Sequence, residues 1–224
     1  LFFMSKQRII LKLSCLLTLI FSSTFSIAQN LILNGDFEEF TKCPKGLDSQ
    51  KEKPKVLLHV TNPNQGSFDF IHTCDNDDFP RYRWGEETPQ SGEGYVGIGV
   101  YDNTFLYLGG EYVQLEIKKP LKKGAIYQFE MYLSLGDKSF TAINNLGVCF
   151  SDSLVQQLKP KQLLFQPDII TTDFYENKVG WKKYSGDYIA NGGEKHILIG
   201  NFFSKEYTKV NNTKTLNKRV TKDN

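Results

Sequence analysis

The segment 127–135, YQFEMYLSL, alternates apolar and polar side chains along its whole length. The side chains of a strand point alternately to opposite faces, so such a segment buries one face and exposes the other. The pattern therefore predicts a half-buried antiparallel strand. The apolar face would carry Tyr127, Phe129, Met131, Leu133 and Leu135.

Further strand-like segments follow the same design at 94–101, 111–117, 145–151 and 196–203. Turn signals separate them at 118–124, 135–139 and 190–194. Only residues 152–158 resemble a helix, and Pro160 would end it. This spacing predicts an all-β fold over residues 29–204, a two-sheet antiparallel β-sandwich.

The N-terminal part of this region divides into an opening strand and a long irregular stretch. The opening stretch NLILNGDFEEF, residues 30–40, is expected to supply the first strand of the domain. Residues 41–90 are rich in proline and irregular, which predicts long loops on the rim of the sandwich, where binding residues are often presented.

The first 28 residues have the features of a secretory signal peptide. Lys6 and Arg8 precede an apolar run, and Ser26-Ile27-Ala28 offers small residues at the cleavage site. We therefore expect export to the periplasm, the outer-membrane surface or the extracellular space. We expect no transmembrane segment in the mature chain.

The charge is nearly balanced. The 224 residues hold 27 basic and 25 acidic side chains, a net charge of +2. Removal of residues 1–28, which contain three basic residues and no acidic one, leaves 24 against 25, a net charge of −1. A nucleic-acid-binding protein needs a clustered basic face, so this charge argues against that class, and we expect no nucleic-acid partner.

The basic, polar residues 205–224 indicate a loop or disordered tail, or a chain cut before a final strand.

Three cysteines remain after cleavage. Cys43 and Cys74 lie in polar, loop-like sequence, and an exported chain meets an oxidising compartment, so we expect them to form a disulfide. Cys149 lies in an apolar strand-like run and is expected to be a buried free thiol.

The motif Asn-Gly-Asp within residues 30–40 is a candidate cation site. A hard cation such as Ca²⁺ prefers carboxylate and backbone carbonyl oxygens, and Asp36 and Glu38 could supply carboxylates at this bend. The alternative is a type I′ turn or a bulge with exposed acids.

Aromatic residues beside polar ones are candidate ligand contacts. Tyr82 and Trp84 lie beside Arg83 in an irregular loop, and Tyr101 precedes Asp102. Sugar rings stack on such side chains, and the neighbouring polar groups can hydrogen-bond sugar hydroxyls. The alternative is that these rings pack in the core or at its rim, as aromatic residues commonly do.

The sequence offers no catalytic motif. It contains no G-x-S-x-G, H-E-x-x-H, P-loop or Gly-rich dinucleotide motif. Its paired acids are adjacent in sequence, whereas a glycosidase pair converges across a cleft. We therefore expect a protein that is not an enzyme.

Several segments together resemble a known family. They are NLILNGDFEE, PQSGEGYVGI, EYVQLEIKKPLKKGAIYQFEMYLSLGDKS, AINNLGVCFS and GGEKHILIGNF. In this order they resemble the N-terminal β-sandwich module of exported Bacteroidetes proteins, which often precedes an OmpA-like, peptidoglycan-binding domain. That module is similar to jelly-roll carbohydrate-binding modules of the galactose-binding-like fold. The family's last strand motif and an OmpA-like domain are not found here.

The resemblance implies a jelly roll that lacks its last strand, with a structural calcium ion. In the similar modules an acidic residue of the first motif joins a loop that resembles Ser91-Gly92-Glu93, so Glu93 becomes a third metal candidate. The expected function is binding of a carbohydrate or another cell-envelope polymer. The alternative is a structural or adhesive protein associated with the outer membrane, the N-terminal part of an OmpA-like anchored protein.

Overall fold

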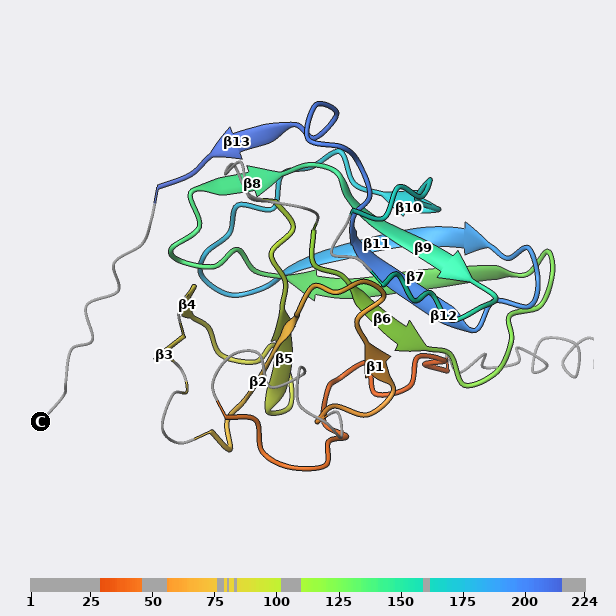
Figure 1. Ribbon diagram of the computed structural model, residues 1–224, viewed down its shortest axis with the longest axis horizontal. Coiled ribbons are helices and arrows are strands. Elements are labelled where there is room, and N and C mark those ends of the chain that lie inside the picture. The colour runs from red at the N-terminus through yellow and green to blue at the C-terminus, as the bar shows by residue number, and fades with distance from the viewer. Residues whose placement is uncertain are drawn as a thin grey trace, which may run out of the picture. The chain divides into compact units, whose positions relative to one another are not determined.

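Strands are the only regular secondary structure in the part of the chain that the computed structural model describes (Figure 1). The described residues are 29–45, 56–75, 79, 81–82, 84–101, 110–158 and 162–214. The expected signal peptide, residues 1–28, lies outside them. None of the described residues belongs to a helix that could cross a membrane.

The strands, with their bounds, are β1 Val60–Thr61, β2 Asp69–His72, β3 Arg81–Tyr82, β4 Gly85–Glu86, β5 Gly94–Gly97, β6 Val113–Glu116, β7 Ile126–Leu133, β8 Thr141–Ile143, β9 Leu146–Ser151, β10 Ile169–Ile170, β11 Lys182–Ile189, β12 His196–Asn201 and β13 Val210–Asn212. Every pairing among them is antiparallel. The expected all-β fold with antiparallel sheets is confirmed.

The largest sheet has the order β1-β6-β12-β9-β10. Its central strand β12 places Ile197 opposite Leu115 on one side and Phe150 on the other. Both faces of this sheet are covered, because Ile197 and its neighbour Leu198 point to opposite faces and are both buried. The sequence 196–201 is accordingly rich in apolar residues without a clear alternation.

The second layer consists of β7 and β11, which pair along eight residues each. Phe129 of β7 and Tyr184 of β11 point inward and pack in one cluster with Val148 and Ile197 of the large sheet. The opposite face of β7 is exposed, as the alternation predicts. Figure 1 shows the two long strands side by side. This packing makes the fold sandwich-like, while the jelly-roll connectivity stays a prediction.

Residues 41–90 contribute more to the core than the loop prediction allows. Phe68 and Phe70, on and beside β2, are fully buried, and they pack with Val56 and Val60. Strands β1 to β4 all lie in this region. The prediction of loops here is wrong in this respect, since β1 and β2 pair with the distant strands β6 and β5, while β3 and β4 form a hairpin with each other.

Residues 152–158 do not form a helix, so that prediction is wrong. The buried amide of Gln114 explains the difference, because it accepts a hydrogen bond from the N–H of Val155 and donates one to its carbonyl. These bonds hold Val155 in a non-helical conformation against the outer face of the large sheet. Leu163 also packs there, so residues 154–158 and 162–166, the covering segment, lie over this face.

The polar residues after 204 also differ from expectation. Val210–Asn212, in the segment expected to be a loop or tail, form β13 and pair with β8. All three side chains are exposed, so backbone hydrogen bonds define this strand and no apolar pattern indicates it.

Candidate functional site

The stretch 30–40 is not a continuous strand. It makes two isolated bridges, Ile32 with Ile117 and Phe40 with Leu57, and a turn lies between them. The N–H of Phe37 donates to the carbonyl of Asn34, and both of these residues have positive φ. The central residues of this turn are Gly35 and Asp36, and neither has positive φ. A type I′ turn requires positive φ at both central residues, so a turn is present here but of another type.

The buried side chain of Asn34 fixes this turn. Its Oδ1 accepts a hydrogen bond of 2.8 Å from the N–H of Glu39, and its Nδ2 donates to the carbonyls of Glu39 and Leu58. Asparagine tolerates the left-handed backbone conformation and can supply all three bonds at once. The turn thereby orients Glu38, which lies between its two ends.

The carboxylate of Glu38 binds the backbone of residues 92–94. Its Oε1 accepts hydrogen bonds from the N–H of Glu93, at 2.6 Å, and of Gly94, at 2.9 Å. Gly92 has a φ of +64°, and a Cβ there would lie 2.3 Å from that same oxygen. Glycine is therefore required at position 92 both for its backbone and for the space that the carboxylate fills.

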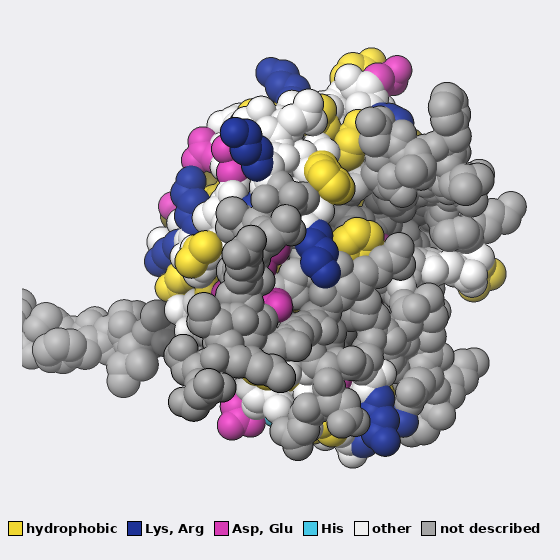
Figure 2. Space-filling view, turned by 90° about the vertical axis from the view of Figure 1, so that its left-hand side faces the viewer, with side chains coloured by type: hydrophobic (Ala, Val, Ile, Leu, Met, Phe, Trp, Pro, Cys, Tyr) yellow, Lys and Arg dark blue, Asp and Glu magenta, His cyan; other side chains and the backbone are white. Residues whose placement is uncertain are grey.

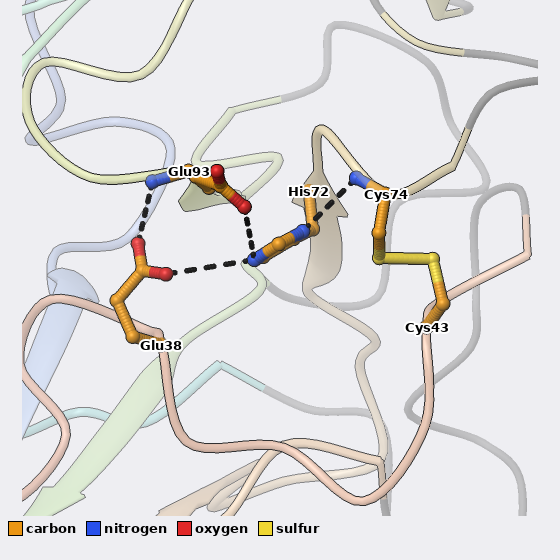
Figure 3. The surroundings of a disulfide bond; sticks show 5 residues. All are labelled: Glu38, Cys43, His72, Cys74 and Glu93. Carbon is orange, nitrogen blue, oxygen red and sulfur yellow. Dashed lines mark hydrogen bonds and ion pairs between the residues drawn. A yellow bond between two sulfur atoms is a disulfide. The ribbon is translucent and has the colours of Figure 1, made fainter.

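His72 lies beside this carboxylate, at the end of β2, as Figure 3 shows. Its side chain is only 4% exposed, and its Nδ1 accepts a hydrogen bond from the N–H of Cys74. The ring proton must then be on Nε2, which lies 3.5 Å from Glu38 Oε2 and 3.9 Å from Glu93 Oε2. Within the described part of the chain this buried Nε2 has no hydrogen-bond partner.

The disulfide predicted between Cys43 and Cys74 is present. It connects the segment that carries Glu38 to the residues that follow β2, so the covalent bond and the carboxylate–backbone bonds close the same corner (Figure 3). Cys149 is buried and free, as expected.

These groups do not fit the implied calcium ion. Two backbone N–H groups already face Glu38 Oε1, and the N–H of His72 faces Oε2, so partial positive charges lie where a cation would bind. Asp36 is exposed, and the described residues include no group of three or more acidic, His or Cys side chains that could hold a metal ion. The calcium ion itself stays a prediction, and we derive no role for it.

The electrostatics favour an ionised Glu38. Burial raises the pKa of this carboxyl, but the hydrogen bonds from Glu93 and Gly94 and the neighbouring His72 outweigh burial and hold the pKa below its usual value. Because its carboxylate binds two backbone N–H groups of a distant loop, we interpret Glu38 with its neighbour His72 as a structural element of the fold.

Trp84 presents a second candidate site. It lies in the turn between β3 and β4, and its side chain is 52% exposed. The turn is nevertheless held firmly, since the carbonyl of Trp84 accepts a hydrogen bond of 3.0 Å from the N–H of Lys138. The N–H of Glu86 donates to Asp137 Oδ2 at 3.1 Å. A Trp side chain exposed to this extent is not a core residue, although tryptophan is highly buried on average.

Trp181 and Tyr95 lie at the other end of the same short segment. Trp181 donates from Nε1 to the carbonyl of Thr88 at 2.8 Å, and its ring meets Tyr95 edge to face at 5.6 Å. The hydroxyl of Tyr95 donates to the carbonyl of Glu87. Thr88 follows Trp84 by four residues, which is at most about 14 Å of chain. We call Trp84, Glu87, Thr88, Tyr95 and Trp181 the aromatic rim.

The side of the molecule on which β3, β4, β8 and β13 lie in Figure 1 is seen in Figure 2. Hydrophobic side chains there are scattered among charged ones, and no large apolar patch is visible among the described residues. A half-exposed aromatic side chain on a surface of mixed polarity is typical of a site that contacts a polar ligand.

The predicted ligand residues are described only in part. Arg83 and Asp102 lie outside the described residues, and of Tyr82 the structure describes the backbone in β3 alone. Tyr101 is half-buried. Nothing described brings Tyr101 to Trp84. The contacts of Trp181 and Tyr95 with residues 87–88 were missed, because Trp181 lies 93 residues from Thr88 in the sequence and was expected only to pack at a strand edge.

His72 was also missed as part of a site. No motif surrounds it in the sequence, and its role depends on a turn and a loop from distant parts of the chain. Its only local signal is its position two residues before Cys74, which a disulfide would fix.

No model of a known protein family matches this sequence, and no curated protein matches it either. The resemblance to the Bacteroidetes envelope modules therefore stays a prediction.

Proposed function

We propose that this chain is an exported, non-catalytic β-sandwich module that binds carbohydrate or another cell-envelope polymer through its aromatic rim. The observation that carries the proposal is the half-exposed indole of Trp84 on a turn fixed by hydrogen bonds to Lys138 and Asp137. The Cys43–Cys74 disulfide is compatible with export.

Stacking would supply the binding energy. The apolar C–H face of a sugar ring can lie on an indole, and each ring that stacks removes apolar surface from water. Polar groups beside the ring would orient the sugar hydroxyls. Glu87 is a candidate, since its Oε2 accepts a hydrogen bond from the hydroxyl of Ser134 and is thereby held in place.

A second candidate is the structural or adhesive envelope protein, and a different observation favours it. The covering segment exposes Leu158 at 83%, Leu164 at 70% and Phe165 at 42%. Exposed apolar side chains on one segment are typical of a surface that another protein covers.

Affinity gel electrophoresis tests the first candidate. Residues 29–224 would run through gels that contain β-glucan, xylan or mannan, and purified peptidoglycan would be used in a sedimentation assay. We expect at least one polymer to bind the protein, and Trp84→Ala to abolish binding. Tyr207→Ala is the matched control, because Tyr207 is an exposed aromatic residue outside the rim.

Retention that survives Trp84→Ala would contradict the proposed site. Absence of retention on every polymer would contradict the carbohydrate proposal and favour the envelope protein. The second candidate then predicts that Leu158→Ser with Leu164→Ser lowers association with an envelope fraction without lowering the melting temperature.

A further inference from the structure

A buried lysine lies under the turn that carries Trp84. Lys178 is only 7% exposed, and its ammonium group donates hydrogen bonds to the carbonyls of Asp137, at 3.0 Å, and of Ser139. An ammonium group is rarely placed in the interior unless its hydrogens are satisfied, because desolvation of the charge is costly. Burial accordingly lowers the pKa of Lys178, and nearby Asp137 opposes this effect.

The loop that Lys178 holds, residues 136–139, contacts the Trp84 turn directly. The N–H of Lys138 donates to the carbonyl of Trp84, and the carboxylate of Asp137 accepts from the N–H of Glu86. The loop thus lies between the lysine on one side and the turn on the other. Any shift of the two carbonyls bound by Lys178 would move both of these bonds.

The contact between loop and turn leaves no free space. A Cβ at Gly136 would lie 2.8 Å from the carbonyl oxygen of Trp84. A Cβ at Gly85 would lie 2.6 Å from the nitrogen of Asp137. A glycine on each side allows the two backbones to meet at this distance, so displacement of one backbone displaces the other.

We propose that Lys178 is the positioning residue of the Trp84 end of the aromatic rim: through the loop 136–139 it fixes the backbone turn from which the indole of Trp84 projects toward a ligand. This inference rests on the proposed function for its meaning, although the positioning itself can be tested without ligand. Lys178 touches no ligand. It acts by ordering the turn that carries Trp84 before binding, which lowers the entropy cost of binding.

The test uses fluorine NMR on protein labelled with 5-fluorotryptophan, in which Trp84 and Trp181 give two signals assigned with Trp84→Phe. In Lys178→Met the amine donors are lost while the apolar stem is kept. We expect the Trp84 signal to shift and broaden and the Trp181 signal to stay. Lys178→Arg, which retains donors, should restore most of the wild-type signal.

Lys195→Met is the matched control, because Lys195 is an exposed lysine with no contact to this loop among the described interactions, and it should change neither signal. If Lys178→Met does not fold, Lys178→Gln replaces it, since an amide keeps two donors on a shorter stem and cannot reach both carbonyls. An unchanged Trp84 signal in either folded variant would overturn the proposal.

Binding separates this inference from the proposed function. On a polymer that retards the wild type, Lys178→Met should weaken affinity by roughly 2- to 10-fold, as expected when one side chain must be ordered on binding. A shifted Trp84 signal with no polymer bound by the wild type would support positioning and contradict the carbohydrate proposal. Equal affinity of wild type and Lys178→Met would overturn the inference alone.

Discussion

The carboxylate of Glu38 accepts a 2.6 Å hydrogen bond from the backbone N–H of Glu93, fifty-five residues further along the chain. The disulfide joins the same segment to the end of β2 over a sequence separation of 31. One side chain and one covalent bond therefore bring three distant pieces of chain together, and His72 fills the space between them.

Replacement of Glu38 by Gln should destabilise the protein in a pH-dependent way. The amide would present a donor to the Nε2–H of His72, and we expect the free energy of unfolding to fall by about 1–3 kcal/mol at pH 7. Because the pKa of Glu38 in the folded protein lies below its usual 4.5, its contribution is present above that pH and is lost as the pH falls below it.

Urea unfolding of the wild type and of Glu38→Gln at pH 7 and at pH 3.5 measures this effect. The difference between the two proteins should shrink at the lower pH. Asp36→Asn, at an exposed acid of the same turn, should change stability by no more than about 0.5 kcal/mol. A difference that grows on acidification would contradict the assignment.

Two glycines allow the space taken by Glu38 to be tested separately from backbone strain. Gly92 and Gly124 both have positive φ, at +64° and +74°. An alanine at 124 meets nothing within 4 Å, whereas one at 92 would overlap Glu38 Oε1. Both substitutions strain the backbone, so Gly92→Ala should cost more than Gly124→Ala, by about 1–3 kcal/mol for the displaced carboxylate.

Thermal or urea unfolding of both variants gives the comparison. The Glu38→Gln background supplies a check, since part of the excess cost of Gly92→Ala should disappear once the charged hydrogen bonds are already lost. Equal costs for the two glycines in wild-type background would show that the carboxylate is not held where the structure has it.

The sequence predicted the elements whose packing follows a simple period. In β7 the alternation identified the buried face because each inward residue, such as Phe129, contacts the large sheet. Its partner β11 was missed, since it begins with two exposed lysines and carries Gly186 at an inward position. Glycine is needed at this position because a Cβ would lie 2.4 Å from the side chain of Ile169. That contact joins distant residues and cannot be read from the sequence around Gly186.

The candidate site was less predictable than the fold. Glu38 and Glu93 were brought together by a resemblance, yet the contact is made by the backbone N–H of Glu93, which any residue could supply. Trp84 was identified by its type and its neighbours. Lys178 gave no signal, because its partners are backbone carbonyls that have no sequence signature.

Removal of the disulfide should be among the more costly single changes. For a loop of this length, the loss of chain constraint in the unfolded state amounts to about 3–4 kcal/mol. We expect Cys43→Ser with Cys74→Ser to lower the midpoint of urea unfolding accordingly. In the wild-type chain 29–224, a thiol reagent should modify Cys149 alone, and only after unfolding, because that thiol is buried.

The covering segment gives a last prediction, at Tyr112. This fully buried side chain donates its hydroxyl hydrogen to the carbonyl of Asn201 and accepts a hydrogen bond from the N–H of Leu163. Burial raises its pKa to about 12, so the hydroxyl stays protonated at neutral pH. Tyr112→Phe keeps the ring but leaves the N–H of Leu163 without its acceptor and the carbonyl of Asn201 with the longer bond from Gln162, which should cost about 1–3 kcal/mol.

Hydrogen exchange distinguishes a local effect from a global one. In Tyr112→Phe the amide of Leu163 should exchange faster than the global loss of stability explains, because the covering segment loses one of its attachments to the large sheet. The amide of Val155 should keep more of its protection, since Gln114 still binds it. The exposed Tyr207→Phe serves as control, and equal acceleration at both amides would mean that the segment detaches as one unit.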